Sequence, residues 1–222
     1  MASSIRRDEL YKKAFIVYSA FYCIFSAAIS IFYIAVHDWY HAGISLGTFA
    51  IPIALAVMYR LLHWKRVWAL DLLILIFTTI SYQLGACIDL YHLLPGFDKL
   101  AHFLSGTFAG ILCALLYCLL TPEHKVSKES LPLALLFVFF GSMAVAGLWE
   151  IGEYILSKIT LRDMQNVAST GVADSMQDMI VCLLGTLLLL PAVKHLAEGK
   201  TTVLNVLIPP FVEGILPRKN QR

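Results

Sequence analysis

The stretch "GVADSMQDMIVCLLGTLLLL", residues 171–190, decides the fold, because it is apolar enough to cross a bilayer yet begins with Asp174 and Asp178. These aspartates are four residues apart and therefore share one face of a helix. A carboxylate inside a membrane costs at least a few kcal/mol, so such residues face a partner or a water-filled site. The stretch thus predicts a membrane helix whose first turns carry a polar site.

The rest of the chain has the same character. Of 222 residues, 59% are hydrophobic and only 14% are charged, and the mean hydropathy is +0.75, whereas an ordinary soluble domain has about 25% charged residues. A membrane helix needs about 20 apolar residues. We therefore predict an all-α, polytopic membrane protein in which residues 1–198 form a single domain with spans at about 14–36, 43–62, 67–90, 99–120, 131–157 and 173–196.

Two features qualify this outline. Pro52 lies inside the second run and is expected to kink it, which neighbouring helices can compensate in a membrane. Residues 199–222 contain "VLNVLIPPFVEGIL", which is apolar but too short and too rich in proline to cross. We expect this segment to be a cytoplasmic or interfacial tail.

Basic residues predict the orientation, because Lys and Arg near helix ends are retained on the cytoplasmic side. With six spans, every Lys and Arg except Lys99, Lys158 and Arg162 falls on one side; the C-terminal members of that set are Lys194, Lys200, Arg218, Lys219 and Arg222. Both termini should therefore be cytoplasmic. The fourth and sixth spans then begin, and the fifth ends, at the extracytoplasmic face.

Three spans carry ionisable residues near that face. The fourth begins "FDKLAHF", the fifth contains "LWEIGEY" and the sixth contains the two aspartates of the opening stretch. The spacings place Asp98 with His102, and Glu150 with Glu153, on shared helix faces. All three groups should lie at one depth, within about two turns of the outer surface, and we expect them to form one site.

Five carboxylates and one imidazole at one level cannot all stay ionised without compensation. Shared protons, a basic partner such as Lys99 or Arg162, or a bound metal could each supply it. We favour a divalent metal ion, since oxygen-rich sites with one imidazole suit Mg²⁺, Mn²⁺, Fe²⁺ or Zn²⁺. The predicted ligands are Asp98, His102, Glu150, Glu153, Asp174 and Asp178, with Glu153 also as catalytic base and with Lys99 and Gln177 as substrate-binding residues.

Simpler interpretations remain open. Asp98 and Asp174 each follow a glycine and could be first-turn acids that the helix dipole favours. The whole group could also be a structural polar network that holds the helices together. Other polar residues on the same side, which are His37, Asp38, His41, Asp89 and His92, are expected to be solvated loop residues.

Three further patterns indicate structural roles. Asp71 is expected to form an interfacial ion pair with Lys65 or Arg66. Gly106 and Gly110 are separated by three residues, a spacing typical of close helix packing. The cysteines have no CxxC spacing and are expected to be packing residues, namely Cys23, Cys87, Cys113, Cys118 and Cys182.

The three motifs resemble, in order, those of the YjdF-like inner-membrane proteins of unknown function and of the related VanZ-like family. The shared pattern is Asp-Lys-x-x-His, a glutamate pair, and Asp-x-x-x-Asp followed by a glycine, which here is Gly185. The resemblance covers residues 97–190 and implies a bacterial or archaeal cytoplasmic-membrane protein; VanZ-like members are associated with glycopeptide resistance and hence with the cell envelope. The chain departs from the VanZ-like pattern at "ADSMQ", residues 173–177, and has no basic residue in "MQNVAST", residues 164–170.

These observations favour a membrane-embedded, metal-dependent hydrolase or transferase that acts at the outer leaflet on a lipid or lipid-linked envelope precursor. The alternatives are a proton- or cation-coupled transporter and a noncatalytic envelope-associated protein. The sequence contains no basic aromatic groove typical of nucleic-acid binding. The lipid bilayer is thus the expected partner.

Overall fold

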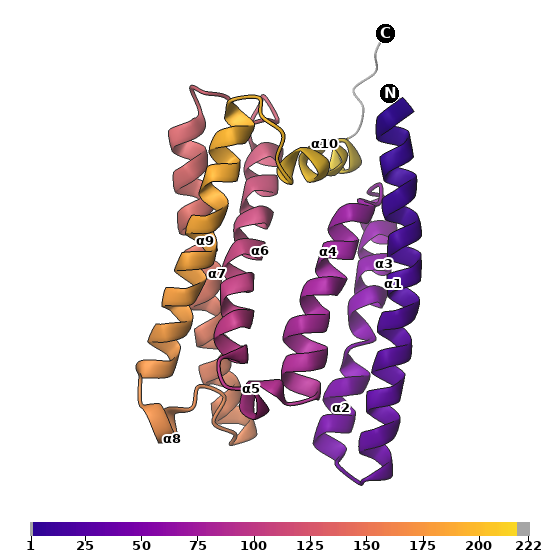
Figure 1. Ribbon diagram of the computed structural model, residues 1–222, viewed down its shortest axis with the longest axis vertical. Coiled ribbons are helices and arrows are strands. Elements are labelled where there is room, and N and C mark those ends of the chain that lie inside the picture. Colours follow the sequence, from indigo (N-terminus) through magenta and orange to yellow (C-terminus); the bar gives the residue numbers. More distant parts are fainter. Residues whose placement is uncertain (1, 217–222) are drawn as a thin grey trace. The chain divides into compact units, whose positions relative to one another are not determined.

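The computed structural model describes residues 2–216, with side chains from residue 6 onward, and its elements are helices throughout this range (Figure 1). Arg218, Lys219 and Arg222, which contribute to the predicted orientation, lie outside the described residues. The chain divides into two compact units, Gly96–Ile208 and Met1–Pro95 with Pro209–Arg222. The single domain expected over residues 1–198 stays a prediction.

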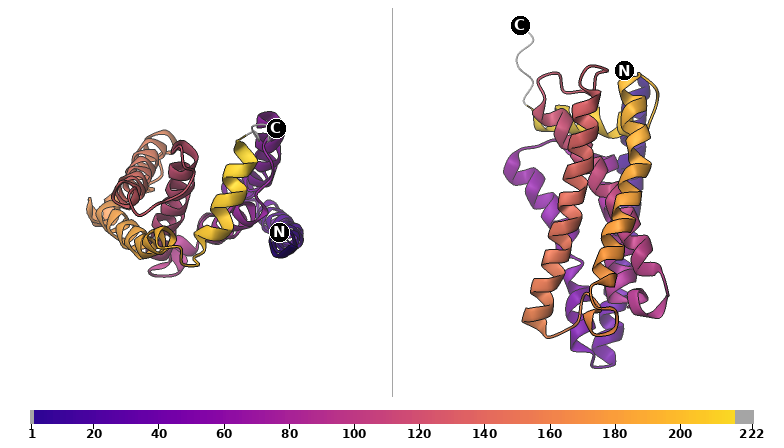
Figure 2. Two further views of the ribbon diagram at one scale, coloured as in Figure 1. Left: turned by 90° about the horizontal axis from the view of Figure 1, so that it is seen from above. Right: turned by 90° about the vertical axis from the view of Figure 1, so that its left-hand side faces the viewer.

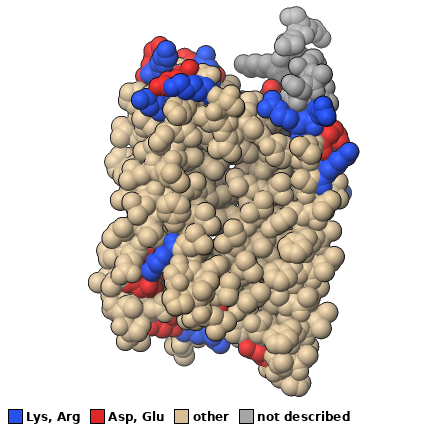
Figure 3. All heavy atoms as spheres, in the orientation of Figure 1, with Lys and Arg blue, Asp and Glu red and all other residues tan. Residues whose placement is uncertain are grey.

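Six helical segments are long and apolar enough to cross a membrane, which confirms the predicted all-α, polytopic class. They are Arg6–Ala35, Trp39–Leu62, Trp68–Cys87, Phe97–Leu120, Leu131–Thr160 and Ala173–Ala197. On the face shown in Figure 3, most acidic and basic atoms lie toward the helix ends, with a broad band of other atoms between them. Large apolar side chains such as Leu148 and Leu188 are exposed on these helices, as lipid-facing residues are. The cytoplasmic orientation of the termini stays a prediction.

The first unit contains α1 (Ala2–Ala35), α2 (Trp39–Gly47), α3 (Ala50–Leu62), α4 (Trp68–Thr78), the π-helix η1 (Thr79–Cys87) and the short α5 (Leu90–Leu93). The second span is interrupted at Thr48 and Phe49, between α2 and α3. Pro52 lies in the first turn of α3, four residues after Thr48. A proline lacks the N–H that would bond to the carbonyl four residues earlier, and its ring clashes with that carbonyl. The interruption at Thr48 and Phe49 therefore lies where the kink expected from Pro52 should fall.

Neutral side chains compensate for these irregular helices. Gln83, in the middle of η1, donates to Tyr22 O at 3.0 Å and to Ser26 Oγ at 2.7 Å. Thr48 Oγ1, at the interruption, donates to the same Ser26 Oγ at 2.6 Å. The Tyr91 hydroxyl donates to the Ser81 carbonyl of the π-helix at 2.6 Å. Hydroxyl and amide groups thus pair with one another and with backbone carbonyls inside an apolar bundle.

One ion pair is buried in this unit. Arg66 Nε lies 2.8 Å from Asp71 Oδ2, and the Tyr59 hydroxyl donates to Asp71 Oδ1 at 2.8 Å. Of the two expected partners of Asp71, Arg66 makes the ion pair, and the carboxylate is buried within the protein with an exposed fraction of 0%. Its interfacial depth in the membrane stays a prediction. Arg66 also lies over the rings of Phe15 and Trp68.

The second unit is built on α6 (Phe97–Leu120), α7 (Leu131–Thr160) and α9 (Ala173–Ala197), which lie side by side in Figures 1 and 2. Helix α8 (Val167–Thr170) lies in the connection between α7 and α9. Helices α6 and α9 begin, and α7 ends, at the same end of this unit, the lower end in Figure 1. The expected common end of the three motifs is therefore confirmed.

Glycines bring α6 and α9 into backbone contact. A Cβ atom built on Gly106 would overlap the carbonyl of Cys182, and one built on Gly185 would overlap the carbonyl of Phe103. Gly110 faces Leu189 of α9. The predicted close packing at Gly106 and Gly110 is confirmed, and Gly185 supplies the matching surface on α9.

The predicted tail contains α10 (Leu204–Ile215), a helix of 12 residues that is too short to cross a membrane. Leu204, Leu207 and Ile208 are buried. Pro209 and Pro210 lie inside the helix. The expectation that this apolar segment does not span is confirmed over its described residues.

Candidate functional site

A lysine stands at the centre of the acidic group. Lys99 Nζ lies 2.6 Å from Asp174 Oδ1, 2.7 Å from Asp178 Oδ1 and 3.1 Å from Asp98 Oδ2. Lys99 and Asp98 belong to the first turn of α6, and the other two belong to the first turns of α9. Of the three remedies for repulsion between the carboxylates, the basic partner is present in this structure.

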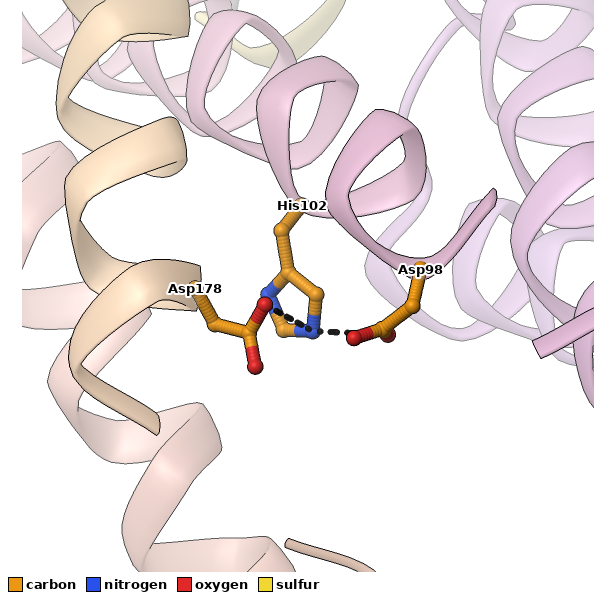
Figure 4. A group of neighbouring side chains, drawn as sticks. All are labelled: Asp98, His102 and Asp178. Atoms are coloured by element: carbon orange, nitrogen blue, oxygen red, sulfur yellow. Dashed lines mark ion pairs between the residues drawn. The ribbon is translucent and has the colours of Figure 1, made fainter. Parts of the chain in front are cut away.

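His102 lies between two of the same carboxylates. Its Nε2 is 3.4 Å from Asp98 Oδ1 and 3.9 Å from Asp178 Oδ1 (Figure 4). One candidate ligand atom from each of Asp98, His102 and Asp178 lies within 4.8 Å of the other two. Three of the six predicted metal ligands are therefore brought together, and the side chain of Asp178 is only 3% exposed.

The second ring nitrogen of His102 lies near a thiol. Cys182 Sγ lies 3.9 Å from His102 Nδ1, donates to the His102 carbonyl at 3.1 Å and lies 3.2 Å from Ser105 Oγ. The sequence analysis assigned Cys182 to packing, and the residue is indeed buried. The spacing from Asp178 could have predicted that Cys182 lies at the site, because residues four apart share a helix face.

Glu150 lies apart from the lysine and is held by the loop between α7 and α8. It is buried, and Gln165 Nε2 donates to Glu150 Oε2 at 3.2 Å, to the Glu150 carbonyl at 3.2 Å and to Ser175 Oγ at 3.0 Å. The next residue, Asn166, donates to Asp174 Oδ2 at 2.8 Å. Two consecutive amides thus hold one carboxylate of α7 and one of α9.

Gln165 and Asn166 were missed by the sequence analysis. The stretch "MQNVAST" contains no basic residue, and the structure uses amide donors at this position instead. Asn166 has a left-handed backbone with φ 50°, a conformation that Asn tolerates better than most residues. These contacts are made by loop residues, so no helical spacing in the sequence predicts them.

Two predicted site residues lie outside the central group. Glu153 is half-buried and accepts a hydrogen bond from Trp149 Nε1 at 2.7 Å on the exposed side of α7. Gln177 is exposed on α9. The catalytic role of Glu153 and the substrate-binding role of Gln177 stay predictions, as does the role of Lys99 in substrate binding.

Among the other polar residues considered, two pairs belong to the first unit. Asp38 pairs with the ring of His41 at 2.6 Å and accepts from its backbone N–H. Asp89 pairs with His92. Arg162, the second basic partner considered, is exposed in the loop after α7.

The donor set and the charge both fit a divalent cation. Two carboxylate oxygens and one imidazole nitrogen from two helices suit Mn²⁺, Fe²⁺ or Zn²⁺, and three protein ligands leave coordination positions open. Asp98, Asp174 and Asp178 carry three negative charges against the single ammonium of Lys99. With a neutral imidazole, the remaining charge of −2 is what one divalent cation would cancel.

Comparison with known proteins places this site within a family. No curated protein and no solved structure matches the chain. A family model described as "Predicted membrane protein (DUF2238)" matches residues 15–197. This range includes the lysine-centred group, which consists of Lys99, Asp98, His102, Asp174 and Asp178. The chain therefore belongs to this family of predicted membrane proteins.

Proposed function

We propose that the chain is a metal-dependent hydrolase or transferase of a bacterial or archaeal cytoplasmic membrane, acting on a lipid or lipid-linked substrate. The observation that carries this proposal is the group of Asp98, His102 and Asp178, whose ligand-type atoms lie within 4.8 Å of one another. The lipid substrate follows from the place of these residues at the end of a membrane helix bundle. The envelope setting rests on the resemblance to YjdF-like and VanZ-like proteins.

Asp98 Oδ1, His102 Nε2 and Asp178 Oδ1 would hold the ion. A bound divalent metal supplies a water of lowered pKa and polarises a carbonyl or phosphoryl oxygen. Because Nε2 must be unprotonated to be a ligand, the imidazole proton would stay on Nδ1, where Cys182 Sγ lies 3.9 Å away. Lys99 keeps its contact with Asp98 Oδ2 and so orients that ligand.

Both oxygens of Asp174 already accept hydrogen bonds, Oδ1 from Lys99 and Oδ2 from Asn166. A general base needs an oxygen that can take the proton from the reacting water. We therefore assign Asp174 to positioning Lys99 and keep Glu153, whose Oε1 accepts from Trp149 Nε1, as the proposed base.

Elemental analysis of the detergent-purified protein tests the proposal. We expect about one divalent metal ion per chain, lost in Asp178→Asn and in His102→Gln, because each substitution removes one of only three ligands. Glu123→Gln is the matched control, since Glu123 is an exposed loop carboxylate. Protein without metal, or with unchanged metal in Asp178→Asn, would refute the metal centre.

Proton or cation transport is the second candidate, and one observation favours it. From His102 toward the middle of the helices, polar groups continue along α6, α7 and α9. They run through Cys182 and Ser105 to the Ser142–Thr186 pair, whose oxygens are 2.7 Å apart. Beyond Thr186 the described interior is apolar, with Val138, Leu189 and Val193 buried. The polar row therefore covers only part of the membrane, which ranks transport below catalysis. Flux in proteoliposomes that Asp178→Asn abolishes would reverse this order.

A noncatalytic role is favoured by the lysine itself, because Lys99 already neutralises part of the group. In that case Asp178→Asn should lower the thermal stability of metal-free protein and change no metal content. The elemental analysis above therefore separates this possibility from the metal centre.

A further inference from the structure

Glu150 has an oxygen that no described residue satisfies. The residue is 8% exposed, and Glu150 Oε1 is buried without a hydrogen-bond partner among the described residues. Its other oxygen, Oε2, accepts from Gln165 Nε2. Leaving a buried charged acceptor unpaired is more costly than leaving a neutral one. Glu150 Oε1 therefore requires a hydrogen-bond donor or a proton.

A proton alone does not satisfy Oε1. A protonated Oε1 becomes a hydroxyl donor, and it would then need an acceptor at the same place. Gln165 cannot supply the missing group, because its Nε2 already serves Oε2, the Glu150 carbonyl and Ser175 Oγ. A ligand that donates a hydrogen bond to Oε1, while Gln165 Nε2 donates to Oε2, gives both oxygens of the Glu150 carboxylate a donor.

The charge around Glu150 favours a cationic donor over a neutral one. Glu150 and Glu153 add two carboxylates at the same end of the unit as Asp98, Asp174 and Asp178. A divalent ion at Asp98, His102 and Asp178 would leave these two glutamates uncompensated. In a medium of low polarity, an ammonium group that also donates hydrogen bonds is the complementary ligand.

The position of Glu150 connects it to the proposed reaction site. Gln165 joins Glu150 to Ser175 at the start of α9, and Asn166 joins the same loop to Asp174, a partner of Lys99. The neighbouring loop residues Leu161 and Asp163 are exposed. A ligand that reaches Glu150 beside this loop would therefore also lie close to the lysine-centred group.

We propose that Glu150 Oε1 binds a primary ammonium group, so that the substrate is an amine-bearing lipid or lipid-linked molecule. This inference rests on the proposed function, because it names the substrate class of that site. The matching chemistry is hydrogen-bond donation from N–H groups to a carboxylate. A quaternary ammonium has the same charge but no N–H donor and should not replace it.

The test uses the full-length protein in nanodiscs that contain phosphatidylethanolamine or phosphatidylcholine, with bound lipid counted by native mass spectrometry. We expect the wild-type protein to bind phosphatidylethanolamine at least about tenfold more tightly, the size of one charge-assisted hydrogen bond. Glu150→Gln should abolish this preference, and the exposed-carboxylate control Glu123→Gln should keep it. Equal binding of the two lipids by wild type, or an unchanged preference in Glu150→Gln, overturns the inference.

A measurement on the wild-type protein covers the case in which Glu150→Gln does not fold. Methylammonium should displace bound phosphatidylethanolamine, and tetramethylammonium at the same concentration should not, because only the former donates hydrogen bonds. Equal displacement by both ions would show a purely ionic effect and contradict the subsite. Metal content, measured in parallel, separates the two proposals: loss of metal in Asp178→Asn with no amine preference overturns this inference alone.

Discussion

The two units both bury polar side chains among apolar helices, but they use different chemistry. In the first unit, neutral groups of Gln83, Ser26 and Thr48 pair with one another beside a π-helix and an interrupted span. In the second unit, the spans α6, α7 and α9 are continuous, and the polar residues at one end are charged. Neutral groups supply hydrogen-bond partners beside irregular backbone, whereas the charges gathered in the second unit lie on continuous helices, which supports the binding site proposed above.

The largest effect should come from the contact that holds the second unit together. The double substitution Gly106→Ala and Gly185→Ala places methyl groups against the carbonyls of Cys182 and Phe103. We expect α6 and α9 to separate, with a loss on the order of 5 kcal/mol and little folded protein in detergent. Gly147→Ala is the control, because a Cβ there meets nothing within 4 Å. Equal thermal stability of both variants would refute the close packing.

The next effect concerns the buried ion pair of the first unit. Arg66→Met leaves Asp71 without its cation in a position with an exposed fraction of 0%. We expect a loss of about 3 kcal/mol, because an uncompensated buried charge is strongly destabilising. Thermal unfolding in detergent measures it, with the exposed Arg60→Met as the control. A loss as small as that of the control would show that the Tyr59 hydroxyl alone compensates Asp71.

Removing the cation of the second unit should have a smaller effect that depends on conditions. Lys99→Met leaves Asp98, Asp174 and Asp178 facing one another. We expect a loss of about 2 kcal/mol without metal, because Asp98 and Lys99 are partly exposed although Asp178 is buried. The mutual repulsion makes the folded protein bind protons more readily than the unfolded chain, so the stability of this variant should fall as pH rises.

Divalent metal ions provide the control for the lysine variant. They should restore its thermal stability toward that of the wild type, because they replace the missing positive charge, whereas they should not narrow the difference in stability between Arg66→Met and the wild type. A Lys99→Met variant that is insensitive to both pH and divalent metal would contradict the ionic description of the site.

The smallest effect is expected at the π-helix. Tyr91→Phe removes the hydroxyl that donates to the Ser81 carbonyl at 2.6 Å and should cost about 1 kcal/mol. Hydrogen exchange of η1 should increase locally, while exchange of α6 and α9 stays unchanged. Faster exchange in both units would mean that the two regions do not respond separately.

Much of the fold could be predicted from the chain alone. Six apolar runs sufficed to locate the spans, because the thickness of a bilayer imposes a minimum length on a membrane helix. The spacings of Asp98 with His102 and of Asp174 with Asp178, together with alternating span direction, also predicted that these residues meet at one end. Pro52 also predicted an irregularity in the second span, which the structure has at Thr48 and Phe49. The π-helix was not predicted, since it depends on side chains from neighbouring helices.

The tertiary structure determines which residues form the candidate site. Helical periodicity tells which residues share a face and at what depth, but it does not tell how far each helix is rotated about its own axis. That rotation places Lys99 among three carboxylates, brings Cys182 to the imidazole and leaves Glu153 with Trp149. The loop that supplies Gln165 and Asn166 follows no repeat, so its contacts with Glu150 and Asp174 arise only when the packed helices bring them within hydrogen-bond distance.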